Sequence, residues 1–216
     1  MKSKHTIILV VSAGVILLVG ALLWYRDEYG GRAAGLAESD QIEDRVEATV
    51  LLRGKSNSLA RETLFKLSQD SELRVALAAV RSLEANTDAR NGEVLRHVLD
   101  SGAAMRVRGA AAAALGKYES VQAKTLVDIL VSDKDPVLRA GAAEGLGRKD
   151  DPAGVDALVT ALNDPEELVR QGAIVGLQRS LGVRFLYDPA APSARRRQAM
   201  ARIRQAVKSM RLDKPR

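Results

Sequence analysis

The side chains best suited to bind an anion are arginines that recur at one spacing. Arg108, Arg139 and Arg170 follow one another at intervals of 31 residues. A guanidinium group can donate two parallel hydrogen bonds to a carboxylate or a phosphate, so such a row could bind an acidic partner or a polyanion. Alternatively, each arginine donates to backbone carbonyls and to turn carboxylates such as Asp135 and Asp164. We favour this internal role, because the arginines belong to a pattern that recurs along the chain.

A second group of cations lies near the C-terminus. Residues 193–210 predict an amphipathic helix, with Met200, Ile203, Val207 and Met210 on one face. The simplest interpretation is that this face docks and the cations remain in water. Contact with anionic lipid head groups, at about 1 kcal/mol per basic residue, is the first alternative. Nucleic acid is less favoured, because no aromatic residues interleave with the arginines. The candidate anion-binding residues are Arg195, Arg196, Arg197, Arg202 and Arg204.

The positive charge of the chain is unevenly distributed. The formal net charge is +6, yet residues 195–216 hold nine basic residues and one acidic residue. Residues 27–194 carry 21 basic and 26 acidic residues, so the body of the chain is acidic. An acidic body argues against a nucleic-acid-binding protein, whose affinity comes largely from cations that contact phosphates.

The sequence offers little for enzymatic chemistry. His97 is the only histidine beyond the N-terminal segment, and the chain has no cysteine. There is therefore no disulfide, no thiolate metal site and no His/Cys cluster at metal-ligand spacing. The glycines at positions 141, 145, 172 and 176 follow no strand and fit helix–helix contacts, not a loop that binds phosphate. We expect no catalytic, cofactor-binding or metal-binding residues.

The elements that must position these side chains are defined by a repeat. Hydrophobic residues recur at intervals of 32, 31 and 31, each followed four residues later by an alanine and eight residues later by a leucine. Positions i, i+4 and i+8 lie on one face of a helix, and the central alanine fits where a neighbouring helix approaches closely. The four copies are Val75–Ala79–Leu83, Val107–Ala111–Leu115, Leu138–Ala142–Leu146 and Val169–Ala173–Leu177.

A second series of leucines lies between these copies. Leucines recur at positions 64, 95, 126 and 158, and again at positions 99, 130 and 162. Each unit is therefore predicted to be a pair of helices joined by a turn. One such pair cannot bury its apolar face alone, so the units must stack on one another.

The turns agree with this arrangement. Asp135–Pro136, Asp151–Pro152 and Asp164–Pro165 each place an N-cap acceptor before a proline at the first helical position. Gly116 and Gly147 follow the repeat leucines, where glycine ends helices.

The segments VRGAAAAALG, LRAGAAEGLG and VRQGAIVGLQ resemble the second helix of short bacterial HEAT repeats of the PBS-lyase type. The resemblance covers about Ser58 to Gly182 and implies a right-handed α-solenoid that binds partners along its concave face. The first unit departs from the pattern, with Ala76 at the arginine position and Arg74 displaced by two residues. HEAT-like folds also include pigment-attaching lyases and DNA base-repair glycosylases, which remain an alternative.

The segment GVRFLYDPAAPSARRRQAMARIRQAV is similar to the closing element of some bacterial HEAT-repeat proteins. This resemblance implies that Phe185 and Tyr187 cover the open end of the solenoid and that a final helix caps it. Ala199 and Ile203 fall on the alanine and leucine positions of the repeat. Val207 stands where relatives often carry tryptophan, so we expect a weaker aromatic contact there.

The N-terminal segment predicts a membrane anchor. Thr6 to Tyr25 is a run of 20 residues without a charge, long enough to cross a bilayer. Trp24 and Tyr25 fit an interfacial belt, and Lys2 and Lys4 favour a cytosolic N-terminus. A cleaved signal peptide is the alternative, although the run exceeds the usual apolar core of such peptides and the nearest cleavage-like sequence, GLA at 35–37, is distant.

These observations predict an all-α protein: an α-solenoid of about four HEAT-like helical hairpins with a C-terminal capping helix, preceded by one transmembrane helix. The expected segments are an anchor at 1–26, a tether with a candidate capping helix at 27–57, the solenoid at 58–182 and the cap with a basic tail at 183–216. We expect a non-catalytic scaffold that binds a protein partner. The expected location is the inner (cytoplasmic) membrane, with Ile7 to Trp24 as its single span and the solenoid on the extracytoplasmic side.

Overall fold

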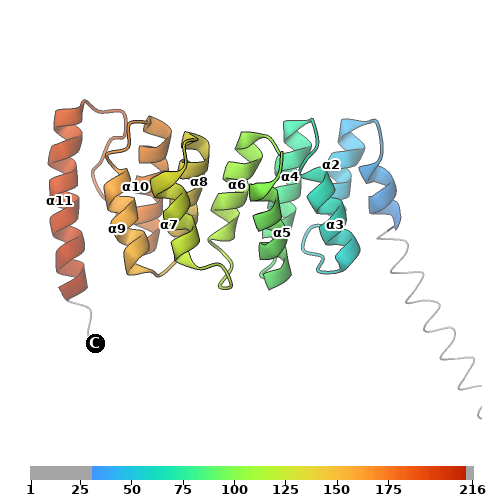
Figure 1. Ribbon diagram of the computed structural model, residues 1–216, viewed down its shortest axis with the longest axis horizontal. Helices are drawn as coiled ribbons and strands as arrows, with labels where there is room; N and C mark the ends of the chain where they lie inside the picture. Colours follow the sequence, from blue (N-terminus) through green and yellow to red (C-terminus); the bar gives the residue numbers. More distant parts are fainter. Residues whose placement is uncertain (1–30, 213–216) are drawn as a thin grey trace, which may run out of the picture.

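The computed structural model describes residues 31–212 (Figure 1). The predicted membrane span, Ile7 to Trp24, lies outside these residues. None of the helices described combines the length and the apolar character needed to cross a membrane. Residues 31–37 are helical, and ten further helices follow: α2 (Ile42–Leu51), α3 (Ser58–Leu67), α4 (Leu73–Glu84), α5 (Ala89–Asp100), α6 (Met105–Leu115), α7 (Ala123–Ser132), α8 (Pro136–Leu146), α9 (Pro152–Ala161), α10 (Glu167–Leu181) and α11 (Ser193–Leu212).

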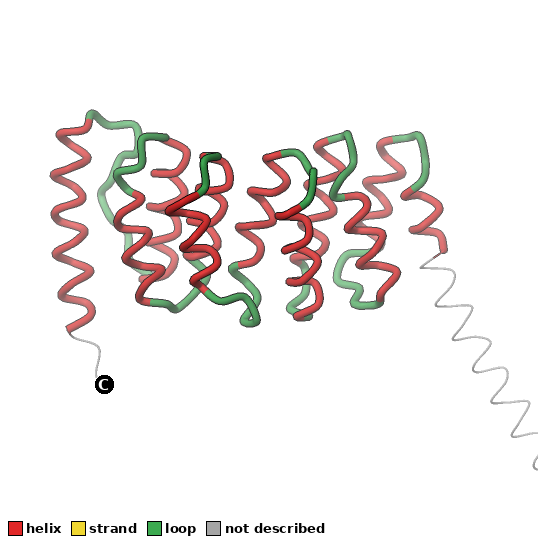
Figure 2. The backbone as a smooth tube through the Cα atoms, in the orientation of Figure 1, coloured by secondary structure: helices red, strands yellow, loops and turns green. Residues whose placement is uncertain are grey.

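The helices form two layers that run along the array (Figures 1 and 2). Helices α2, α4, α6, α8 and α10 contact one another in sequence, and each packs against a helix of the second layer. The second layer contains α3, α5, α7 and α9, and α11 lies beyond α9 at the C-terminal end. No strand is present between residues 31 and 212. The predicted all-helical repeat solenoid is therefore confirmed.

The repeated apolar positions form the core. The alanines at positions 79, 111, 142 and 173 are fully buried, and the hydrophobic residues that flank them are at most 3% exposed. The interleaved leucines of the second series are at most 7% exposed. The predicted pairs of helices thus bury their apolar faces against their neighbours, as stacked units must.

Helix α2 continues the same pattern one unit further toward the N-terminus. Ala48 and Leu52 lie 31 residues before Ala79 and Leu83, and both are buried. Ala33 and Ala37 in the helical segment before α2 are buried too. The first position of the pattern is Asp44, whose carboxylate accepts a hydrogen bond from the Ser39 hydroxyl at 2.6 Å. Because Asp44 stands where the other copies have a hydrophobic residue, the sequence pattern does not reveal this unit.

Two of the three predicted aspartate caps are confirmed. The Asp135 carboxylate accepts from the Val137 amide at 2.7 Å, and the Asp151 carboxylate accepts from the Gly154 amide at 2.8 Å. The prediction for Asp164–Pro165 is wrong, because α10 begins at Glu167 with Glu166 as its N-cap. Asp164 is equivalent to Asp133, not Asp135. It accepts from the Glu166 amide two residues later and thereby forms the turn before the helix.

Gly116 and Gly147 end helices α6 and α8, as predicted, but for a different reason. Their φ angles are −58° and −62°, which any residue can adopt. A Cβ atom on Gly116 would lie 2.0 Å from the Gly145 carbonyl oxygen, and one on Gly147 would lie 2.4 Å from the Gly176 Cα. These glycines are required because the backbones of successive helices in this layer touch.

Replacing Gly116 with alanine should therefore disrupt the stacking of α6 on α8. Because the blocking atom belongs to the backbone, helices α6 and α8 must move apart, and we expect a loss of about 3 kcal/mol of folding free energy. Urea unfolding of the Gly116→Ala variant measures this loss. Gly102→Ala is the matched control, because nothing lies within 4 Å of a Cβ atom there. Equal stabilities of the two variants would contradict the backbone contact.

Candidate partner-binding surfaces

Arg139 connects two consecutive repeat units of the solenoid. Its Nε and Nη2 donate to the two carboxylate oxygens of Asp164 at 3.0 and 2.9 Å. Its Nη1 donates to the carbonyl oxygens of Asp133 and Lys134. Both side chains of the ion pair are 12% exposed, and the hydrogen bonds that Arg139 donates to Asp164 raise the pKa of Arg139. All three nitrogen atoms of the Arg139 guanidinium group therefore donate to acceptors within the protein.

The other two arginines of the predicted row also donate within the chain. Arg170 is 6% exposed; its Nε donates to the Pro189 carbonyl at 2.8 Å and its Nη1 to those of Asp164 and Pro165. Arg108 donates through Nε to the Leu99 carbonyl at 2.6 Å. These bonds hold turns to helices, which accounts for the regular spacing of the arginines without a ligand.

Arg45 belongs to this row too, although the predicted row did not include it. Its Nε and Nη2 donate to the Asp70 carboxylate at 2.7 and 3.2 Å, and its Nη1 donates to the Ser39 carbonyl. The separation of 25 residues between arginine and aspartate is the same as in Arg139–Asp164. That separation was the sequence signal that could have revealed the pair.

The first unit of the predicted repeat carries Ala76 at the arginine position. Alignment of the repeat units explains why no arginine is needed there. Gly102 occupies the position in the next unit that is equivalent to Asp70 and Asp164. The arginine is therefore missing where the carboxylate is missing as well, so no buried charge is left without a partner.

Replacing Arg139 with methionine should leave the half-buried Asp164 carboxylate without its cation. We expect the free energy of unfolding to fall by about 3 kcal/mol, the size typical for breaking a buried pair. Arg106→Met serves as the control, since Arg106 is exposed on the preceding repeat and should change stability by less than about 0.5 kcal/mol. Urea denaturation of both variants gives the comparison. Similar losses of unfolding free energy would argue against the ion pair between repeat units.

The C-terminal helix α11 closes the array. Met200, Ile203 and Val207 are at most 5% exposed and belong to the core, as the predicted amphipathic helix requires. Within the part of the chain that the structure describes, no carboxylate or carbonyl pairs with the exposed cations of this helix, which are Arg195, Arg197, Arg202, Arg204 and Lys208. The docked helix thus presents a basic surface to solvent.

Arg196 differs from the other cations of α11. Its Nη1 donates to the Ala191 carbonyl at 2.7 Å, while its Nε is buried and has no acceptor among the described residues. It lines a cavity of about 390 Å³ with Leu186, Tyr187, Asp188, Ala191, Arg195 and Ala199. We call this the cap pocket. It lies between the segment that precedes α11 and the first turns of that helix.

The aromatic residues of the closing segment pack as predicted. Phe185 and Tyr187 are partly buried against the core at the C-terminal end of the array. The Tyr187 hydroxyl donates to the Leu162 carbonyl, and burial raises the pKa of Tyr187. Tyr187 therefore fixes one wall of the cap pocket to the last hairpin.

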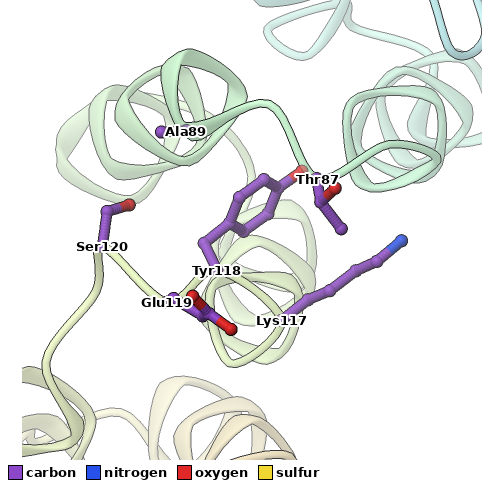
Figure 3. A pocket seen from close by; sticks show the side chains of 6 residues that line it. All are labelled: Thr87, Ala89, Lys117, Tyr118, Glu119 and Ser120. Carbon is purple, nitrogen blue, oxygen red and sulfur yellow. The ribbon is translucent and has the colours of Figure 1, made fainter.

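A second cavity, of about 450 Å³, lies at the turn between α6 and α7. Figure 3 shows its lining, which consists of Thr87, Ala89, Lys117, Tyr118, Glu119 and Ser120. Tyr118 is 1% exposed, and its hydroxyl donates to the carbonyls of Leu83 and Asn86 at 2.8 and 3.0 Å. The Tyr118 ring also lies against Gly92 of α5, where a Cβ atom would be 3.1 Å from it. Tyr118 therefore wedges this turn against the preceding hairpin, a contact that the sequence did not indicate.

Burial raises the pKa of Tyr118, so folding favours its neutral form and stability should fall above about pH 10, where the unfolded tyrosine ionises. Tyr118→Phe should cost about 1 kcal/mol near neutral pH through the lost hydrogen bonds. At pH 11 the wild type should have lost about 1.4 kcal/mol, so the order should reverse and Tyr118→Phe should be more stable by about 0.4 kcal/mol. Urea unfolding of both proteins at the two pH values provides the measurement, and a difference independent of pH would contradict the neutral buried tyrosine.

Helix α10 exposes two apolar side chains on one face. Leu168 is 47% exposed and Val175, seven residues later, is 42% exposed. Val175 also lines an open cavity of about 610 Å³ with Gln178, Arg179, Gly182, Val183 and Arg184. This face, which we call the α10 face, combines exposed apolar contacts with two arginines, as protein-binding surfaces often do.

His97 lies on the exposed side of α5, where its ring meets the edge of Phe65 at a centroid distance of 6.4 Å. Across residues 31–212, no three His, Cys, Asp or Glu side chains are grouped so that they could hold a metal ion.

A family comparison agrees with the repeat architecture over part of the chain. A family model described as HEAT repeats matches residues 123–208, which extend from α7 into the capping helix. A solved structure of a designed armadillo repeat protein, YIII(Dq)4CqI, shares 16% identity with a TM-score of 0.39, and the match covers 69% of this chain and 81% of that one. No curated protein matches significantly. The family match supports the resemblance to HEAT repeats on the region that carries the α10 face and most of the cap.

Proposed function

We propose that this protein is a non-catalytic scaffold, tethered to a membrane, whose solenoid surface binds a protein partner. The α10 face carries the proposal. Leu168 and Val175 expose apolar surface on α10, in the layer that also contains α2, α4, α6 and α8. The turns beside α10 are held in place by hydrogen bonds from Arg139 and Arg170. A preformed surface loses little conformational entropy when a partner binds.

The proposed tether rests on the sequence. The uncharged run from Thr6 to Tyr25 is long enough to span a bilayer, and Lys2 and Lys4 favour a cytosolic N-terminus. With this topology the solenoid lies on the extracytoplasmic side of the inner (cytoplasmic) membrane. Its partners would then be extracytoplasmic proteins or the outward-facing parts of membrane proteins.

A photo-crosslinking residue at position 175 in the full-length chain, expressed in a bacterial host, tests the α10 face. We expect one defined adduct with a protein from position 175 and none from position 131, a 67% exposed valine on α7 in the other layer. The Leu168→Glu change should abolish the adduct because it places a charge in the centre of the contact. Adducts of equal intensity from both positions would refute the assignment of this face.

An enzyme or a nucleic-acid-binding protein, such as a HEAT-like lyase or glycosylase, is the second candidate, favoured by the basic surface of α11 alone. A C-terminal alkaline phosphatase fusion separates the two proposals, since it is active only outside the cytoplasm. We expect an active fusion. An inactive phosphatase with a fluorescent C-terminal green fluorescent protein fusion would place the solenoid in the cytoplasm, where nucleic acid becomes accessible.

A further inference from the structure

We infer that the cap pocket binds the carboxylate of an aspartate or glutamate side chain from an acidic segment of a partner protein. The inference deepens the proposed function, on which it rests, by specifying the chemistry of the partner at the C-terminal end of the array. Three observations carry it: the register of Arg196, its unfilled donor edge and the charge around it.

Arg196 occupies the arginine position of the repeat. It precedes Ala199 by three residues and Ile203 by seven, the same offsets that separate Arg139 from Ala142 and Leu146. The Nη1 of Arg196 donates to the carbonyl five residues earlier, as do those of Arg139 and Arg170. The guanidinium group of Arg196 is therefore held in the same orientation relative to its helix as its equivalents.

At two positions of the array this orientation presents Nε and Nη2 to a carboxylate of the following unit, whereas the Nε of Arg108 and of Arg170 donates to a carbonyl oxygen. Arg45 donates through these atoms to Asp70, and Arg139 donates to Asp164. No unit follows α11 among the described residues, and the Nε of Arg196 is buried without an acceptor. The end of the array thus repeats the arginine half of the pair and leaves the carboxylate half to another molecule.

The surroundings of Arg196 favour a protein carboxylate. Arg195 lines the same cavity, and the one carboxylate there, that of Asp188, accepts from the Ala190 amide at 2.9 Å. Leu186 is 95% exposed at the rim and could contact an apolar neighbour of the acidic residue. A side chain on an extended segment can enter this cavity more readily than a flat membrane or a duplex can. The planar fork also matches a carboxylate with two parallel hydrogen bonds.

The test uses the full-length protein in detergent micelles and a fluorescent nine-residue peptide of alternating leucine and aspartate, with its asparagine counterpart as control. We expect binding of the aspartate peptide at about 0.15 M salt and at least tenfold weaker binding of the asparagine peptide. Arg196→Met and Arg196→Lys should each weaken binding about tenfold, because neither side chain offers the two parallel donors.

Arg197→Met is the matched control, since it removes the same charge from an exposed position on the same turn of α11. It should change the affinity less than twofold. Equal losses in the Arg196 and Arg197 variants, or equal binding of the two peptides, would overturn the inference in favour of unspecific attraction to a basic helix. Displacement of the peptide when anionic phospholipid is added to the micelles, but not when zwitterionic phospholipid is added, would overturn it in favour of a lipid ligand.

The Arg196→Lys variant guards against misfolding, because it keeps the charge and the stem of the side chain. Its melting temperature should match that of the wild type. If the peptide fails to bind while the crosslink from position 175 persists, only the cap-pocket inference fails. If the crosslink is absent as well, the scaffold function itself fails.

Discussion

The structure depends on the contact of backbone with backbone between helices α6, α8 and α10. A Cβ atom on Gly141 would lie 2.1 Å from the Gly109 carbonyl oxygen, and one on Gly176 would lie 2.3 Å from the Ala143 carbonyl oxygen. Helices this close have no room for side chains between them. Large apolar residues are therefore confined to the space between the two layers, where the repeated leucines lie. Because packed interiors tolerate little added volume, this contact fixes both the spacing and the register of the units.

Close stacking of the helices leaves the turns to be held by polar bonds. The arginines perform this role, because one guanidinium group reaches carbonyls of its own turn and a carboxylate of the following unit. The pairs Arg45–Asp70 and Arg139–Asp164 show the full arrangement, whereas Arg108 and Arg170 donate through Nε to a carbonyl oxygen instead. Tyr118 holds the turn between α6 and α7 to the preceding hairpin, because its hydroxyl donates to two carbonyl oxygens there.

An array of this kind differs from a globular domain at its ends, where the last unit lacks a neighbour. At the C-terminal end the apolar requirement is met by Phe185, Tyr187 and the buried face of α11. The hydrogen-bonding groups at this end are satisfied only in part, because the buried Nε of Arg196 has no acceptor among the described residues. The cap pocket and the α10 face both lie near this end of the array.

The sequence by itself determined the repeat, the helical pairs, the buried alanine and leucine positions and the docking face of α11, because these follow from a helical period that every unit repeats. It did not determine the first unit, where Asp44 replaces a hydrophobic residue, or the start of α10, where Asp164 forms a turn and Glu166 precedes the helix. The roles of Tyr118 and Arg196 were decided only by the tertiary structure. Whether a polar side chain is satisfied depends on carbonyls and carboxylates that the fold brings to it from other units, and no local pattern records that.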